Sequence, residues 1–265
     1  MKRQLLQIAS AGMLSTTALF AFSLAEPTLP LFPSSQALAA EEMALTPTEI
    51  YEQTISSVVT IALLNENYEV LSHGSGFIVD SDGLILTNAH VLTSEHAAVG
   101  VMLSDGSQLL ADIVGFDRRG RDLAAVRLRG EHDLPVLKLS KNEGARVGDA
   151  VFAIGAPQSI NNSNTMTSGI ISNIEANRTA IMHNAAINGG NSGGPLIDRY
   201  GEVIGINTKI AVASVVGRGG QVIGYADGHI GMGLAIASDE IHPFLAALRL
   251  GFVSEVSQPG QLAQN

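Results

Sequence analysis

The sequence predicts an all-β fold with two sets of six short strands and a short C-terminal helix. Runs rich in valine, isoleucine and leucine recur between residues 58 and 237, separated by turns of Gly, Asp and Asn. A polar connector at 141–148 divides them into the two sets. No long helical pattern interrupts the first set, so we expect it to close into a small barrel without exposed sheet edges.

Residues 1–40 predict an export signal outside the fold. A basic start precedes a mostly apolar stretch, Ile8 to Ala25, and Ala37-Leu-Ala39 matches the pattern of signal peptidase sites. The sequence is consistent with cleavage after Ala25, Ala39 or Ala40. An uncleaved membrane anchor is the alternative, because the stretch beginning at Leu5 is long enough to cross a bilayer at about 1.5 Å per helical residue.

A short helix is expected before the first strand set. Thr46-Pro-Thr-Glu49 is a capping box with proline at the first helical position, which predicts a helix from 47 to about 55. Asp82-Gly83 and Asp105-Gly106 predict hairpin turns. The expected strands of this set are Val58–Leu64, Ser75–Asp80, Gly83–Asn88, Ala98–Ser104, Gln108–Asp117 and Asp122–Arg129.

The second set ends in a helix. Ser238-Asp-Glu is expected to cap a helix over 238–250, and residues 251–265 form a polar tail. An apolar stripe typical of core packing consists of Ile241, Phe244, Leu245, Leu248 and Leu250. The expected strands are Asp149–Gly155, Thr165–Ile174, Thr179–Ala185, Pro195–Asp198, Glu202–Ile210 and Ile230–Ala237.

Composition narrows the function. The 265 residues are 46% hydrophobic, which supplies a core, and the absence of cysteine excludes disulfides and thiol chemistry. A formal charge of −10, with no Lys or Arg between Arg3 and Arg118, argues against nucleic acid as a partner. Seven histidines show no metal-ligand spacing, and most are expected in loops or at the surface. We therefore expect no metal and no cofactor.

The stretch 184–196, which reads Asn-Ala-Ala-Ile-Asn-Gly-Gly-Asn-Ser-Gly-Gly-Pro-Leu, contains the candidate nucleophile Ser192. A serine hydroxyl needs an imidazole to accept its proton and a carboxylate to orient that imidazole. His90 follows an apolar run, and Asp122 opens another. A tight surface turn is the alternative for the serine stretch, and a salt bridge with Arg121 is the alternative for Asp122.

Five motifs occur in succession: Gly-Ser-Gly-Phe-Ile-Val (74–79), Leu-Thr-Asn-Ala-His-Val (86–91), Asp-Leu-Ala-Ala-Val (122–126), Thr-Ser-Gly-Ile-Ile-Ser (167–172) and Ala-Ala-Ile-Asn-Gly-Gly-Asn-Ser-Gly-Gly-Pro-Leu (185–196). Over about residues 46–250 the sequence resembles the HtrA/Deg family of trypsin-fold serine proteases. The resemblance implies two six-stranded antiparallel β-barrels of the trypsin-like (chymotrypsin) fold, at about 56–140 and 149–237, with the active site between them. It also implies an ATP-independent endopeptidase that acts on unfolded or damaged proteins.

The resemblance assigns roles to residues. His90 is implied as general base and then acid, Asp122 orients it, and Ser192 attacks the scissile carbonyl; the backbone N–H groups of Gly190 and Ser192 form the oxyanion hole. The implied substrate pocket contains no charged side chain, which predicts cleavage after small or medium aliphatic residues. Its lining comprises Ala185, Ala186, Ile187, Gly205, Ile206, Asn207, Gly233, Leu234 and Ala235.

Several features depart from the family pattern. The sequence ends at Asn265, which leaves no room for the usual PDZ domain. Asn184 replaces the usual Asp, and Gly189 stands where Pro is common. The segments 155–164 and 209–231 are expected to be mobile loops whose ordering regulates activity.

Two other functions stay open at this point. The chain could be a holdase or regulatory subunit that binds unfolded segments between the barrels without cutting them. A glutamyl-specific protease is a further alternative, for which His229 is the one nearby basic candidate. The resemblance leaves open a homo-trimer or a hetero-oligomer with related proteases, and membrane association through the N-terminal segment. The expected location is the periplasm, an organelle lumen or the cell exterior.

Overall fold

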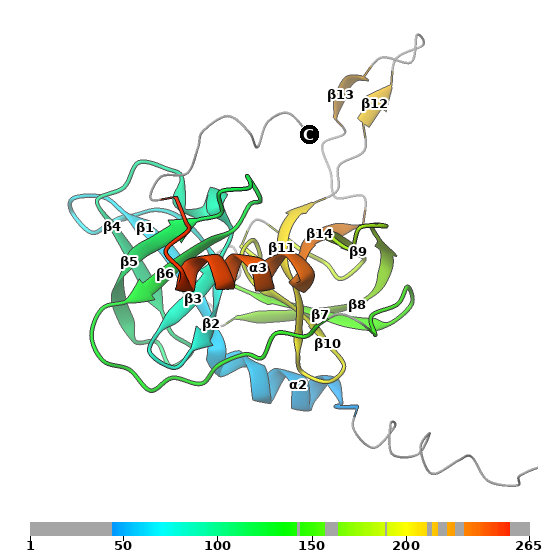
Figure 1. Cartoon of the computed structure of the whole chain (residues 1–265), viewed down its shortest axis with the longest axis horizontal. Coiled ribbons are helices and arrows are strands. Elements are labelled where there is room, and N and C mark those ends of the chain that lie inside the picture. The colour runs from blue at the N-terminus through cyan, green and yellow to red at the C-terminus, as the bar shows by residue number, and fades with distance from the viewer. Residues whose placement is uncertain are drawn as a thin grey trace, which may run out of the picture. The chain divides into compact units, whose positions relative to one another are not determined.

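Two closed six-stranded antiparallel barrels make up most of the described chain (Figure 1). The computed structural model describes residues 44–141, 144–156, 164–188, 190–210, 214–216, 222–225 and 231–254. The barrels confirm the predicted all-β fold class. No helix within these ranges has the length and apolar character needed to cross a membrane.

The first barrel has the strand order β1-β2-β3-β6-β5-β4, and β1 pairs with both β2 and β4 to close it. Its hairpin turns at Gly83 and Gly106 have φ angles of +88° and +87°, a region that glycine enters without strain. The strand β2 begins earlier than predicted, because its exposed first residues Val70 and Leu71 continue the pairing with β1. The strands are β1 Val58–Leu64, β2 Val70–Asp80, β3 Leu84–Thr87, β4 Ala98–Met102, β5 Gln108–Phe116 and β6 Ala124–Leu128.

The second barrel has the order β10-β11-β14-β9-β8-β7. A separate hairpin, β12 Ser214–Val216 with β13 Val222–Tyr225, falls inside the segment predicted as a loop. The barrel strands are β7 Ala150–Gly155, β8 Thr165–Ile174, β9 Ala180–His183, β10 Pro195–Asp198, β11 Val203–Ile210 and β14 Gly233–Ala237. The predicted export signal, the loop residues 157–163, Gly189, His229 and the tail from 255 lie outside the described residues.

The two helices follow different capping rules. α2 (Pro47–Thr54) has the predicted capping box, in which Thr46 and Glu49 exchange hydrogen bonds. α3 (Ser238–Arg249) corrects the predicted cap, because its N-cap is Ala237. The buried Ser238 hydroxyl donates instead to the carbonyl oxygen of Ser140, 2.7 Å away. The predicted stripe was wrong at Leu250, which is 70% exposed because the helix ends one residue earlier.

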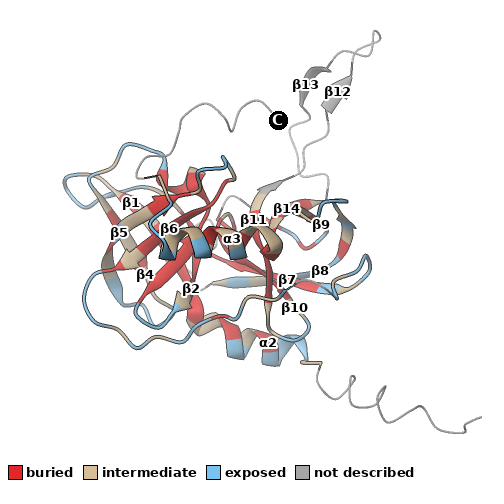
Figure 2. Ribbon diagram, viewed as in Figure 1, coloured by how far each residue is buried: buried red, intermediate tan, exposed pale blue. Residues whose placement is uncertain are grey.

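A shared apolar cluster holds the barrels together. Each barrel has its own interior, and a third cluster combines side chains from both barrels and from α2 and α3. Figure 2 shows buried residues along the strands of both barrels. Its fully buried members include Phe77 of β2, Ile154 of β7, Ile50 of α2 and Phe244 of α3. Burial of each such side chain contributes about 1.5–3 kcal/mol, so the cluster fixes how one barrel sits on the other.

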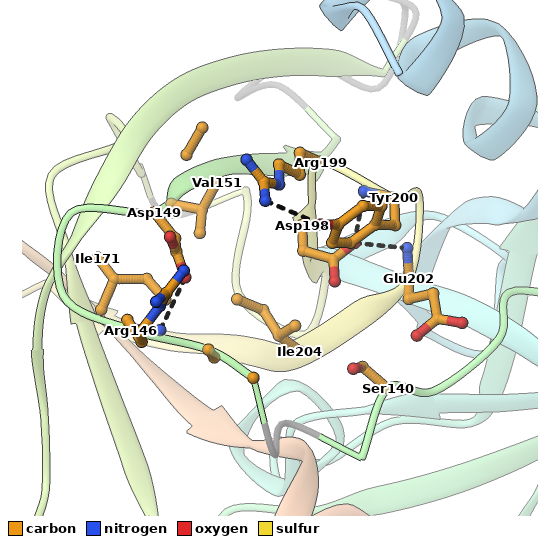
Figure 3. A pocket seen from close by; sticks show the side chains of 13 residues that line it. Ser140, Arg146, Asp149, Val151, Ile171, Asp198, Arg199, Tyr200, Glu202 and Ile204 are labelled. Carbon is orange, nitrogen blue, oxygen red and sulfur yellow. Dashed lines mark hydrogen bonds between the residues drawn. The ribbon is translucent and has the colours of Figure 1, made fainter. Parts of the chain in front are cut away.

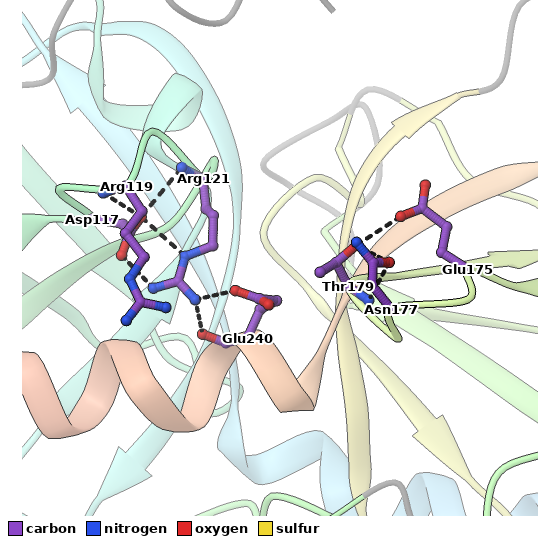
Figure 4. A network of polar contacts seen from close by, with 7 residues as sticks. All are labelled: Asp117, Arg119, Arg121, Glu175, Asn177, Thr179 and Glu240. Atoms are coloured by element: carbon purple, nitrogen blue, oxygen red, sulfur yellow. Dashed lines mark hydrogen bonds and ion pairs between the residues drawn. The ribbon is translucent and has the colours of Figure 1, made fainter.

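A polar network adds a second connection (Figure 4). Arg121 forms an ion pair with Asp117 at 2.5 Å and another with Glu240 of α3. Its guanidinium also donates to the Glu240 backbone carbonyl at 2.7 Å. Since Arg121 is engaged in this way, the adjacent carboxylate of Asp122 is available for a different partner.

Candidate active site

His90 and Asp122 meet because their strands are neighbours. His90 lies in a 3-10 helix, Ala89–Leu92, directly after β3, and Asp122 lies just before β6; β3 and β6 pair antiparallel. The His90 Nδ1 atom is 2.6 Å from Asp122 Oδ2, and the His90 backbone N–H donates to Asp122 Oδ1 at 2.9 Å. These two hydrogen bonds from His90 to the Asp122 carboxylate fix the orientation of the imidazole ring. An ionised carboxylate only accepts, so Nδ1 bears the proton and Nε2 is free to act as a base.

The Asp122 carboxyl is held in its ionised form. Burial alone would raise its pKa, but hydrogen bonds from the His90 ring, from Thr208 and from the His90 backbone, together with the positive charge of His90 whenever its ring is protonated, place the pKa below its usual range. The native contacts of Asp122 therefore add stability above the unfolded-state pKa of about 3.9, and this contribution is lost as the pH falls through the lower folded-state value.

Thr208 of β11 brings the second barrel to this pair. Its hydroxyl donates to Asp122 Oδ2 at 2.5 Å, and its carbonyl oxygen accepts from the Ser192 hydroxyl at 3.3 Å. No sequence pattern assigns Thr208 a role at His90 and Asp122. The role was missed because Thr208 and Asp122 are 86 positions apart, and no local pattern marks such a contact.

The Ser192 hydroxyl is directed at Thr208 in this structure. No hydrogen bond joins it to His90 in the described part of the chain, although both side chains are partly exposed. Proton transfer to His90 therefore requires the hydroxyl to turn about its Cα–Cβ bond, which is a nanosecond rotation for an accessible side chain.

The two predicted oxyanion donors, the N–H groups of Gly190 and Ser192, differ in whether they already have an acceptor in the serine loop and its surroundings, where the serine loop is defined as residues 190–194. The Gly190 N–H donates to Asn188 Oδ1 at 3.0 Å, so substrate must displace this side chain to reach it. Of the amides at 190–194, the Ser192 N–H alone has no acceptor among the described residues. It is thus ready to bind an oxyanion.

Comparison with known proteins agrees with this geometry. A family model described as a trypsin-like peptidase domain matches residues 74–206, which include His90, Asp122 and Ser192. The chain belongs to the trypsin-like peptidase domain family.

Three curated relatives of this trypsin-like peptidase domain carry serine protease names. Serine protease HTRA1 of Xenopus tropicalis is 42% identical over 183 residues, covering 65% of this chain and 35% of the relative. Serine protease HTR4 of Rattus norvegicus is 38% identical over 212 residues, 74% of this chain and 39% of the relative. Human serine protease HTRA3 is 38% identical over 190 residues, 66% and 38% respectively. The chain therefore spans well under half the length of these relatives.

In this trypsin-like peptidase domain, several of the residues predicted to line the substrate pocket lie together in the interior of the second barrel. Ala185, Ile187 and Ala235 pack in the interior cluster of the second barrel, and Gly233 lets Ile187 approach, because an added Cβ would lie 2.5 Å from Ile187 Cδ1. Ile206 does not belong to this interior cluster. Its side chain packs in the cluster between the barrels.

The other predicted pocket residues differ in exposure. Ala186 is exposed and Leu234 half-buried, whereas Gly205 and Asn207 are buried. The side-chain amide of Asn207 donates to the backbone carbonyls of Gly194 and Pro195 at 3.2 and 3.0 Å, so this side chain holds the C-terminal end of the serine loop in place.

His183 is an exception to the expected surface placement of histidines. It is fully buried on β9, and its Cε1 lies 2.8 Å from where a Cβ on Gly233 would stand.

The Thr208 hydroxyl should matter for turnover. The change Thr208→Val is expected to lower kcat about tenfold or more, because a hydrogen bond to a charged group contributes about 1.5–3 kcal/mol and about 1.4 kcal/mol is a factor of ten. Thr93→Val is the matched control, since the Thr93 hydroxyl donates to the His90 backbone carbonyl at 3.0 Å and does not touch Asp122. Steady-state kinetics with a peptide substrate measure the effect, and equal kcat values for the two variants would contradict it.

A cavity of about 630 Å³ lies elsewhere in the second barrel (Figure 3). Its lining contains none of the predicted site residues. Asp198 lines it, and burial raises the pKa of this carboxyl, although the backbone N–H groups of Glu202 and Tyr200 act in the opposite direction. When the pKa of a carboxyl is raised by folding, the folded protein loses stability as the pH rises from the unfolded-state pKa of about 3.9 through the folded-state pKa.

Neutralising Asp198 should therefore stabilise the fold. We expect Asp198→Asn to raise Tm by a few degrees at pH 7, and the difference to vanish below about pH 3.9, where both side chains are neutral. Asp112→Asn is the control, because a hydrogen bond from Arg129 lowers the pKa of Asp112, and neutralising that residue should not raise Tm. Thermal unfolding across pH tests this; an equal gain at pH 3 and pH 7 would be inconsistent with it.

Proposed function

We propose that this chain is an exported serine endopeptidase that cleaves unfolded or damaged proteins without ATP, after small or medium aliphatic residues. The observation that supports it best is the 2.6 Å contact between His90 and Asp122, joined through Thr208 to the Ser192 hydroxyl. The family match and the names of the relatives support the same chemistry.

The chemistry follows from these contacts. His90 Nε2 removes the Ser192 proton as Oγ bonds to the scissile carbonyl carbon, and the carbonyl oxygen becomes an oxyanion at the Ser192 N–H. The protonated His90 then gives its proton to the leaving amine as the C–N bond breaks. A water molecule then gives a proton to His90 and attacks the acyl carbon; the bond from that carbon to Ser192 Oγ breaks, Oγ takes the proton back from His90, and the new carboxyl terminus is released. Asp122 stays ionised throughout and stabilises the imidazolium.

An unfolded substrate fits a site between two closed barrels. The scissile bond must reach Ser192 in an extended segment, which compact proteins rarely present. The apolar side chains of Ala185, Ile187 and Ala235 offer no partner for a charged residue. Export is supported by the leader at 1–40.

The test is cleavage of casein by the full chain, with fragment ends read by mass spectrometry. We expect cuts after Val, Ala, Ile or Leu, and no cuts by Ser192→Ala. Cuts that follow Lys, Arg or Glu would contradict the substrate preference. Failure to cut casein or any unfolded protein would contradict the activity itself.

One observation favours a second candidate, a protein that binds unfolded segments without cutting. The Ser192 hydroxyl is bonded to Thr208, and the Gly190 N–H is bonded to Asn188, so both are engaged without substrate. A holdase would suppress aggregation of an unfolded protein equally well before and after Ser192→Ala, and the unaltered chain would leave that protein intact.

A further inference from the structure

Ser75 is the point at which the first barrel contacts the serine loop. It lies on β2, is fully buried, and has no part in the chemistry described above. Its hydroxyl accepts from the Ala156 N–H at 2.7 Å and donates to the Gly190 carbonyl at 2.6 Å. One side chain thus links β2, the end of β7 and the serine loop.

The backbone of Ser75 holds the same loop a second time. Its N–H donates to the carbonyl of Ser192 at 2.8 Å. The carbonyls of Gly190 and Ser192 are therefore both fixed by Ser75. Their peptide units are also held at the other end, because the Asn191 N–H donates to Asn188 O at 3.0 Å and the Gly193 N–H to Asn207 O at 2.8 Å.

This arrangement determines where the Ser192 N–H points. That amide belongs to the peptide between the two fixed units, and its own carbonyl, Asn191 O, accepts from the Gly194 N–H at 3.0 Å. With both neighbouring units fixed, this peptide can turn only about the line that joins the Cα atoms of Asn191 and Ser192, and the bond from the Gly194 N–H opposes that turn. The amide without an acceptor in the serine loop is thus directed by contacts with Ser75.

The packing leaves Ser75 no room to adjust. A Cβ on Gly155 would lie 2.7 Å from its hydroxyl oxygen, and one on Gly193 would lie 2.2 Å from its carbonyl oxygen. That carbonyl also accepts from the Thr87 hydroxyl at 2.7 Å.

We propose that Ser75 is a positioning residue for the oxyanion hole: its hydroxyl, by holding the Gly190 carbonyl, aims the Ser192 N–H at the charge that develops on the substrate. The inference rests on the proposed peptidase function. Ser75 does not touch substrate, so it affects the transition state and leaves substrate binding unchanged.

The test compares Ser75→Ala with Thr54→Val in the full chain. Each removes one buried hydroxyl that donates to a backbone carbonyl, but the Thr54 hydroxyl donates to Ile50 within α2, at 2.6 Å, and has no contact with Ser75 or the serine loop. For a peptide with valine at the cleavage site, we expect Ser75→Ala to lower kcat about 10- to 100-fold with KM unchanged, somewhat less than direct loss of an oxyanion donor. Thr54→Val should change kcat less than about threefold while lowering Tm by a similar amount.

A peptide aldehyde supplies a readout that lost stability would not change. It adds to Ser192 and forms an oxyanion, so its affinity for Ser75→Ala should fall by the same factor as kcat. The matching peptide alcohol forms no oxyanion and should bind both proteins equally. Ser75→Cys has a weaker hydrogen-bond donor at the same place, so its kcat and aldehyde affinity should lie between those of the unaltered chain and of Ser75→Ala. This variant provides the test if Ser75→Ala does not fold.

The outcomes separate the two proposals. If the unaltered chain cleaves the peptide but Ser75→Ala and Thr54→Val have the same kcat and aldehyde affinity, Ser75 has no positioning role and the peptidase assignment stands. If the unaltered chain neither cleaves peptides nor binds the aldehyde more tightly than the alcohol, the peptidase assignment fails and the role of Ser75 fails with it.

Discussion

Replacing Ser192 with alanine is expected to reduce peptide cleavage at least about a thousandfold. The change removes the oxygen that bonds to the substrate carbonyl, while the hydrogen bonds of His90 with Asp122 stay in place. The side chains predicted to bind substrate are also unaltered, so binding of an uncleaved peptide should persist. Initial rates on casein and on a fluorogenic peptide measure the loss.

Ser104→Ala is the matched control for this change. Ser104 is an exposed serine in the turn after β4 and makes no contact with the site. Its replacement should leave the rate unchanged. A Ser192→Ala protein that kept more than about a tenth of the activity would show that another group is the nucleophile.

Replacing Gly193 with alanine is expected to have the largest effect on stability. Gly193 has φ of +85°, and an added Cβ would lie 2.2 Å from the Ser75 carbonyl oxygen and 2.3 Å from the Thr87 hydroxyl. The left-handed conformation alone costs alanine about 1–2 kcal/mol, and overpacking adds about 1–3 kcal/mol. We expect the free energy of unfolding to fall by about 3 kcal/mol or more, with loss of activity because the serine loop must move.

Gly106→Ala separates the two costs. Gly106 has nearly the same backbone, with φ of +87°, but nothing lies within 4 Å of an added Cβ. Only the conformational cost of about 1–2 kcal/mol applies there, and activity should be retained. Urea unfolding of both variants measures the difference. Equal destabilisation would mean that the contact between Gly193 and the first barrel is unimportant.

The sequence predicted those parts of the molecule that depend on local patterns. The β-rich runs became the strands of both barrels, and the Thr46 capping box starts α2 because its hydrogen bonds span only three positions. The prediction at Ser238 failed because a contact with Ser140, 98 positions away, replaced the local cap.

In the candidate site, too, the sequence predicted what local motifs specify and missed what depends on distant contacts. Motifs placed His90, Asp122 and Ser192 together, since the chemistry of a serine nucleophile demands those side chains. Thr208 and Ser75 escaped notice, because they act through partners 86 and 115 positions away and carry hydroxyls that are unremarkable in sequence. The bonds from Ser192 to Thr208 and from Gly190 to Asn188 depend on rotamers, which no sequence pattern specifies.

The most direct test of a serine nucleophile activated by His90 and Asp122 needs no substrate. The full chain would be treated with a fluorophosphonate, which reacts with activated serines, and the modified residue located by mass spectrometry. We predict a single adduct on Ser192 that forms at least about a hundredfold more slowly in His90→Ala. Absence of an adduct on Ser192, or equal labelling of the His90→Ala protein, would contradict the account.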